Sequence, residues 1–250
     1  SLTDWADGTP IVMPVSGEFE SIGDWSAWNG LPERRWLGPD HWANRMQDWS
    51  IRDGALVCDN AKLSQTKTVH QLANQLGSGT GGFSLKTRMS FTKAGTAGFG
   101  GFLIGGGQGH LHYKGASTIS GTPGKGGGII AAVDYNGFGL SFRDMNDAAQ
   151  IVHPGPIAET ETRNAMTPLS TEADLVLLLE GVHVPVSSDY TLRLSAWSTD
   201  ESTLLGAIEL TGVDPSLLIG NIALASEGGE SDGEVTFERW YKRGTKWSTA

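Results

Sequence analysis

Residues 49–58 read WSIRDGALVC, in which Asp53-Gly54 separates two apolar-alternating segments. Alternation with a period of two is typical of a strand that buries one face. Asp and Gly tolerate the positive φ angles of a type I′ turn, which joins antiparallel strands through two residues. This stretch therefore predicts a β-hairpin over 49–58.

The same alternation recurs along the chain and is clearest at 83–91 and 190–196. The predicted strands are 49–58 broken at its turn, 69–76, 83–91, 98–104, 129–133, 138–142, 174–180, 190–197, 203–210, 221–226 and 234–241. A sustained helical pattern of apolar residues at i, i+3, i+4 and i+7 is absent from the sequence. The chain is therefore expected to be all-β, with two antiparallel sheets whose apolar faces pack together as a β-sandwich.

Composition excludes several classes of protein. The chain carries 18 Lys and Arg against 28 Asp and Glu, a net charge of −10. Phosphate-backbone binding depends on clustered Lys and Arg, and no cluster is denser than 33–35, so we expect no nucleic-acid partner. The longest strongly apolar stretch, 175–179, is far shorter than the ~20 residues of a membrane-spanning helix. Cys58 is the single cysteine, so no disulfide can form within the chain.

Chains of this length commonly form one β-sandwich, and we assign residues 1–250 to a single domain. Three segments lack a strand pattern: the tryptophan-rich segment 1–48, the glycine-rich segment 105–128 and the proline-containing segment 153–171. We expect the first to pack on the sandwich and the other two to be connections. Such loops often carry function in β-sandwiches.

Five of the nine tryptophans lie between residues 25 and 49, close to several carboxylates. Flat aromatic faces stack on the apolar faces of sugar rings, while carboxylates bind the hydroxyl groups. We therefore predict ligand binding by Trp28, Trp36, Trp42 and Asp48. The alternative interpretation is that the tryptophans fill the sandwich and cover its edge, because Trp is usually highly buried.

A second predicted ligand contact is formed by His110, His112 and Tyr113, in the glycine-rich segment. Alternation would place the two imidazoles on one strand face. A His/Tyr pair also serves as acid and base in jelly-roll polysaccharide lyases, but the Arg-x-Glu-x-Arg strand of those enzymes is absent here. The alternative is that the histidines are structural. No second group at metal-ligand spacing accompanies them, so no metal site is assigned.

Two sets of carboxylates have spacings that suggest sites. Residues 230–234, Glu-Ser-Asp-Gly-Glu, superficially match the Glu-x-Asp-x-Glu pattern of laminarinase-type glycoside hydrolases, but their glycine-rich flanks favour a solvated loop. Glu18 and Glu20 with Glu238 would bracket a structural calcium if the terminal strands pair, although no loop spacing supports this.

Common catalytic motifs are absent. Neither Gly-x-Ser-x-Gly nor His-Glu-x-x-His occurs, and the glycine-rich runs lack the order of a phosphate-binding loop. We therefore assign no catalytic residue and no cofactor, and expect that this chain is not by itself an enzyme.

Segments 42–58, 69–76, 98–104 and 237–244 together carry a resemblance. The chain resembles the N-terminal region of bacterial alkaline-phosphatase-D-type metallophosphoesterases, in which a concanavalin A-like domain precedes the catalytic domain. The opening Trp-x-x-x-Asp-Gly-x-Leu is also similar to laminin-G and 3-keto-glycoside hydrolase-like domains. The resemblance implies a concanavalin A-like jelly roll. The Asp-x-His and Gly-Asn-His motifs of the phosphatase domain are absent, so no catalytic residue is carried over.

Two hypotheses for the function follow. The resemblance implies a non-catalytic accessory domain, carbohydrate-binding or structural, of a larger secreted or periplasmic hydrolase with a downstream catalytic domain. The second hypothesis is a carbohydrate-active enzyme, a polysaccharide lyase or keto-glycoside hydrolase that uses His112, Tyr113 or loop carboxylates. A glycan or polysaccharide is the expected ligand in both.

Overall fold

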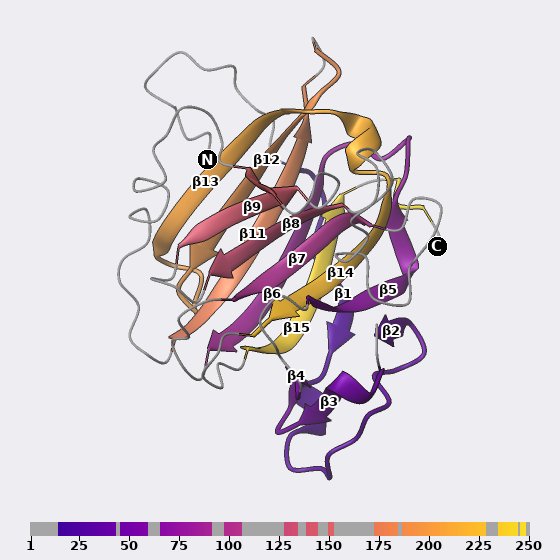
Figure 1. The fold of residues 1–250 in the computed structure, drawn as a ribbon, viewed down its shortest axis with the longest axis vertical. Helices are drawn as coiled ribbons and strands as arrows, with labels where there is room; N and C mark the ends of the chain where they lie inside the picture. Colours follow the sequence, from indigo (N-terminus) through magenta and orange to yellow (C-terminus); the bar gives the residue numbers. More distant parts are fainter. Residues whose placement is uncertain are drawn as a thin grey trace.

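The computed structural model describes residues 15–43, 46–59, 66–91, 98–106, 128–134, 139–144, 150–152, 173–184, 187–228, 235–244 and 246–248. Within these ranges the chain forms two antiparallel β-sheets that lie face to face (Figure 1). The described part contains short 3₁₀ turns but no α-helix, and none of its helical turns is long and apolar enough to cross a membrane. The predicted all-β, two-sheet fold is confirmed.

The first sheet has eight strands in the described residues. Its order is β13 (Leu204–Val213), β12 (Tyr190–Trp197), β11 (Ala173–His183), β6 (Phe83–Phe91), β15 (Val235–Gly244), β4 (Ala55–Cys58) and β3 (Trp49–Arg52), and β1 (Glu20–Asp24) also pairs with β15. The predicted hairpin is present as β3 and β4, and the φ angles of Asp53 and Gly54 are 52° and 76°. Both angles suit a type I′ turn, so the turn residues act as expected.

The second sheet has seven strands in the same described ranges. Its order is β10 (Gln150–Val152), β9 (Leu140–Asp144), β8 (Ile129–Asp134), β7 (Phe99–Gly106), β14 (Gly220–Glu227), β5 (Lys67–Leu76) and β2 (His41–Ala43). Most strands lie within a few residues of their predicted bounds. Pairing with neighbours extends several of them, because backbone hydrogen bonds continue beyond the apolar pattern.

The apolar faces of the two sheets meet in one core. In β6 the residues Phe83, Leu85 and Met89 are buried, whereas the intervening Lys86 and Arg88 are only partly so. Two of the tryptophans that crowd the first 49 residues, Trp25 and Trp49, are completely enclosed in this core. They fill the sandwich, as the alternative interpretation of the tryptophan-rich segment expects.

Two strands form inside the segment that the sequence predicts to be irregular. β1 pairs with β15 and β2 pairs with β5, so part of 1–48 belongs to the sheets. β1 reads Glu-Ser-Ile-Gly-Asp and has too little alternation to be recognised. Its partner strand supplies the hydrogen bonds, a tertiary contact that a local pattern does not contain.

Candidate functional site

An exposed group of aromatic and basic side chains lies beside the edge strand β3. The backbone N–H of Arg34 donates to the carbonyl of Ile51 (3.1 Å), and the N–H of Ile51 donates to the carbonyl of Arg34 (2.7 Å). This two-bond bridge continues the eight-stranded sheet by one residue beyond β3. The position of the Arg34 backbone is therefore set by the sheet and not by the loop alone.

The Arg34 guanidinium contacts two indole rings. Its central carbon lies 3.1 Å from the ring centroid of Trp28 and 5.1 Å from that of Trp36. A guanidinium over an aromatic face is held by the ring quadrupole and by stacking. Desolvation lowers the pKa of Arg34, and the guanidinium stays cationic at neutral pH. We call these three residues the Trp28–Arg34–Trp36 cluster.

The two indoles of the cluster differ in exposure. Trp28 packs partly against the core, whereas Trp36 exposes 59% of its surface. An exposed Trp carries a large apolar face that most folds would bury. The side chain of Trp36 is therefore available as a stacking platform for a ligand ring.

The turn of the predicted hairpin packs against the loop beside Trp28. Trp28 ends the 3₁₀ turn η1 (Ser26–Trp28), and its backbone N–H donates to the carbonyl of the buried Trp25 (2.9 Å). A Cβ added to Gly54 would lie only 3.1 Å from Asn29 Cβ. The β3–β4 turn and the loop that follows η1 thus touch, so the hairpin supports the cluster from one side.

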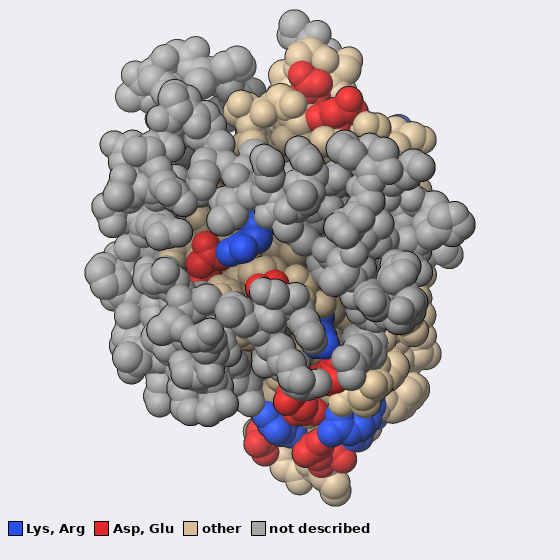
Figure 2. Space-filling view, viewed as in Figure 1, with Lys and Arg blue, Asp and Glu red and all other residues tan. Residues whose placement is uncertain are grey.

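Charged side chains surround the cluster, and most of them are paired. Arg35 lies 3.1 Å from Asp59 and 3.9 Å from Glu33, and Arg52 lies 3.3 Å from Asp59. Figure 2 shows acidic and basic side chains gathered at this end of the molecule, over β3 and β4. Arg34, in contrast, has no carboxylate at ion-pair distance among the described residues. A sequence indicates that an arginine is present but not whether it has a counter-ion, so Arg34 was not predicted.

The other predicted ligand contacts lie elsewhere. Trp42 is in β2 of the other sheet, with its ring 5.6 Å from that of His70. Asp48 is buried and its carboxylate lies 3.0 Å from the ammonium of Lys67. The structure thus joins Trp28 to Trp36 through Arg34 but places Trp42 and Asp48 in separate surroundings. His110, His112 and Tyr113, with the 230–234 carboxylates, lie outside the described residues.

The outer face of the seven-stranded sheet carries a second polar group. The Arg143 side chain lies 2.6 Å from the Asp134 carboxylate and 4.5 Å from the ring centroid of Phe99. The hydroxyl of Ser141 donates to the same carboxylate (3.0 Å). This arginine is neutralised by its neighbour, and its role is explained by packing on this face.

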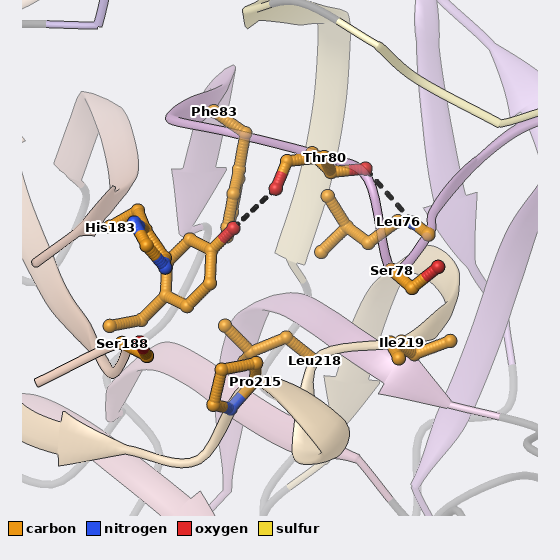
Figure 3. Close-up of a pocket in the computed structure, with 11 residues that line it drawn as sticks. Leu76, Ser78, Thr80, Phe83, His183, Ser188, Pro215, Leu218 and Ile219 are labelled. Atoms are coloured by element: carbon orange, nitrogen blue, oxygen red, sulfur yellow. Dashed lines mark hydrogen bonds between the residues drawn. The ribbon is translucent and has the colours of Figure 1, made fainter. Parts of the chain in front are cut away.

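A small pocket of about 230 Å³ lies where the ends of β5, β6 and β12 meet (Figure 3). Its residues are Leu76, Gly77, Ser78, Thr80, Phe83, His183, Ser188, Tyr190, Pro215, Leu218 and Ile219. The Thr80 hydroxyl accepts from the Gly77 N–H (2.9 Å) and donates to the Lys246 carbonyl (3.1 Å). This hydroxyl is therefore engaged in holding the 77–82 turn, and the pocket is smaller than the roughly 300–1,000 Å³ of typical ligand sites.

The predicted calcium site requires the terminal strands to pair, and the structure meets this requirement only. The terminal strands do pair, but Glu20 lies 3.1 Å from the Lys242 ammonium and Glu238 lies 3.3 Å from Arg88. Both carboxylates are thus directed to cations. In the part of the chain that the structure describes, no three His, Cys, Asp or Glu side chains gather as metal ligands. The described residues do not fit a bound calcium.

No protein-family model and no curated protein sequence matches this chain. Solved structures do share its fold. The carbohydrate recognition domain of Emp47p matches with a TM-score of 0.55 at 12% identity, covering 91% of this chain and 97% of that one.

Two further structures agree with this comparison. The Ca²⁺-bound exoplasmic/lumenal domain of VIP36 matches with a TM-score of 0.56 at 10% identity (91% and 92% covered). Lectin II from Ulex europaeus matches with a TM-score of 0.56 at 12% identity (87% and 100% covered). The chain therefore has the concanavalin A-like jelly-roll fold that these legume-lectin-like domains share.

Proposed function

We propose that this protein binds carbohydrate through the Trp28–Arg34–Trp36 cluster. The observation that carries the proposal is the 59% exposure of Trp36 beside an arginine whose backbone is bonded to the sheet edge. A binding module needs an aromatic face that is both accessible and held in place, because flexible side chains lose entropy on binding. Trp36 is accessible to a ligand, and its contact with Arg34, which also packs on Trp28, holds it in place.

The chemistry of the surroundings suits a sugar. Sugar rings present apolar C–H faces that pack on an indole and hydroxyl groups that bind charged and polar side chains. Glu33, Arg35 and Asp59 supply such groups beside the cluster. The shared fold supports this choice, since one structure with that fold, lectin UEA-II, is complexed with galactose (TM-score 0.56, 13% identity).

The wider context belongs to the same proposal. We propose that residues 1–250 act as one non-catalytic accessory domain of a larger secreted or periplasmic hydrolase, as the resemblance to the phosphatase N-terminal region implies. Trp42, His110, His112 and Tyr113 remain predicted contributors to the ligand surface, whereas Asp48 is buried against Lys67 and does not reach it. Calcium enters only as a variable of the binding assay, because a metal-bound relative of the fold exists.

A panel of immobilised neutral and acidic glycans tests the proposal, with and without Ca²⁺. The parent protein is expected to bind at least one glycan, and Trp36→Ala is expected to weaken that binding about tenfold or more, a loss of ~1.4 kcal/mol. Leu204→Ala, on the edge strand β13 and also exposed, is the matched control and should bind like the parent. Failure of the parent to bind any glycan, or unchanged binding by Trp36→Ala, contradicts the proposal.

A further inference from the structure

We infer that the glycan bound by the Trp28–Arg34–Trp36 cluster is anionic, and that Arg34 binds the acidic group of the sugar that stacks on Trp36. The inference rests on the proposed function and names the ligand class of the same site. It comes from one contrast within this surface: Arg34 has no carboxylate at ion-pair distance in the described ranges, whereas the neighbouring Arg35 and Arg52 each have one.

The neighbouring arginines are neutralised inside the protein. Arg35 pairs with Asp59 and Glu33, and its guanidinium also donates to the carbonyl of Gln47 (2.5 Å). Arg52 shares the Asp59 carboxylate. Arg34 makes neither an ion pair nor a side-chain hydrogen bond with any described residue. Its positive charge therefore has no counter-ion among the described residues and can be met by a bound anion.

The position of Arg34 suits an external anion. Stacking on Trp28 uses the face of the guanidinium. Its Nε atom is buried without a hydrogen-bond partner, and its terminal N–H groups, which lie in the plane, make no hydrogen bond to the described residues. The terminal N–H groups have the fork geometry that matches a carboxylate or sulfate. The backbone bridge to Ile51 restricts the motion of the residue. Arg34 is therefore preorganised to bind an anion, with no carboxylate partner in the part of the chain that the structure describes.

Arg34 and Trp36 are close enough for one sugar unit to contact both. The guanidinium carbon lies 5.1 Å from the Trp36 ring centroid, on one side of the exposed indole. A uronic acid carries its carboxylate on the ring carbon next to the ring oxygen, so a uronate that packs on the exposed part of Trp36 beside Arg34 can extend that carboxylate to the guanidinium. One acidic sugar can thus contact both members of the cluster.

The net charge of −10 does not prevent this binding. Salt at physiological concentration screens charges beyond roughly 8 Å, so the local pairing around the cluster dominates over the charge of the whole chain. The carboxylates of Glu33 and Asp59 are engaged with Arg35. An approaching anion therefore meets Arg34 as a local positive site.

The test compares three fluorescent oligosaccharides by titration: an oligogalacturonate, its fully methyl-esterified neutral form, and a sulfated galactan oligomer. The parent is expected to prefer a charged oligomer over the neutral one by about tenfold or more, as a charge-assisted bidentate contact gives. The comparison between the carboxylated and sulfated oligomers identifies the acidic group. Raising the salt concentration should reduce the preference for charged oligomers over the neutral one.

Variants of Arg34 separate the contribution of its charge to binding from the contribution of stacking on Trp36. Arg34→Gln should remove the preference for the charged oligomers and retain binding of the neutral one, and Arg34→Lys should retain part of the preference because it keeps the charge. Arg88→Gln, which removes an equal charge on the face of β6, should behave like the parent. Thermal unfolding of each variant confirms that it is folded.

The two proposals fail in different ways. If the parent binds none of the oligomers or panel glycans, the proposed function is contradicted and this inference with it. If the parent binds charged and neutral oligomers equally, or if folded Arg34→Gln keeps the preference, the inference is wrong while carbohydrate binding stands.

Discussion

The carboxylate of Asp48 lies 3.0 Å from the ammonium of Lys67, and both side chains are almost completely buried. Asp48 immediately precedes β3 of one sheet and Lys67 begins β5 of the other, so the ion pair connects the two sheets. Removing one partner leaves a buried charge without its counter-ion. We expect Lys67→Met to lower the free energy of unfolding by about 3–5 kcal/mol in urea denaturation.

The double variant Asp48→Asn with Lys67→Met removes both charges and should regain part of that loss. The control is Lys86→Met, which breaks a pair with the half-exposed Glu201 (3.0 Å) and should cost under about 1 kcal/mol. Equal losses for Lys67→Met and Lys86→Met would show that burial of the first pair has no energetic effect.

Gly54 and Gly30 have similar backbone conformations but different surroundings. Their φ angles are 76° and 75°, yet a Cβ on Gly54 would lie 3.1 Å from Asn29 Cβ, whereas one on Gly30 meets nothing within 4 Å. Both Ala variants carry the strain of positive φ, about 1–2 kcal/mol. Gly54→Ala should be the less stable of the two because it also displaces the loop beside Trp28, and chemical denaturation measures the difference.

The hydroxyl of Tyr190 anchors the turn that borders the Figure 3 pocket. It donates to the carbonyl of Thr80 (2.5 Å) and lies 3.1 Å from the carbonyl of Gly81. Tyr190→Phe leaves these carbonyls without that donor, and we expect a loss of about 1–2 kcal/mol in the free energy of unfolding. Tyr241→Phe is the control, because the Tyr241 hydroxyl makes no hydrogen bond to the described residues. A Tyr190→Phe protein as stable as this control would contradict the anchoring role.

His70 predicts a pH dependence of stability. Burial lowers its pKa to about 4 in the folded protein, against about 6.5 in the unfolded chain. Between these pH values the unfolded state binds a proton that the native state does not. The contribution of neutral His70 to the free energy of unfolding is therefore fully present above pH 6.5 and is lost as the pH falls towards 4. The loss from this residue approaches about 3 kcal/mol, from ~1.4 kcal/mol per pKa unit.

His41, whose pKa is also lowered by burial, contributes in the same direction, so the variant His70→Gln isolates one residue. Its free energy of unfolding should fall less between pH 7.5 and pH 5 than that of the parent. An unchanged pH dependence in His70→Gln would mean that His70 titrates alike in both states.

Local patterns were sufficient for most of the sheets. Asp53-Gly54 predicts its hairpin because the turn type depends on those two residues alone, and the alternation in 83–91 predicts which side chains of β6 enter the core. β1 and β2 were not predicted, since their strand conformation depends on pairing with β15 and β5. Such pairing joins residues that are distant in the sequence.

The sequence predicted only part of the Trp28–Arg34–Trp36 cluster, because the exposure of a side chain also depends on tertiary contacts. Composition drew attention to Trp28 and Trp36, because many tryptophans near carboxylates are typical of sugar-binding surfaces. The same composition includes Trp25 and Trp49, which are buried in the core. Nothing in the local sequence distinguishes the exposed from the enclosed rings, since exposure depends on how the two sheets meet.

The sequence by itself determined the fold class. Period-two alternation and turn-forming residues recur along the chain and favour antiparallel sheets, because the backbone conformation of a residue depends on its neighbours in sequence. Only the tertiary structure decided which charges are paired. Asp48 meets Lys67 inside the sandwich, Arg35 meets Asp59 at the surface, and Arg34 is left between two indoles without a carboxylate among the described residues. Electrostatic pairing depends on distances across the fold, and those distances exist only once the sheets have packed.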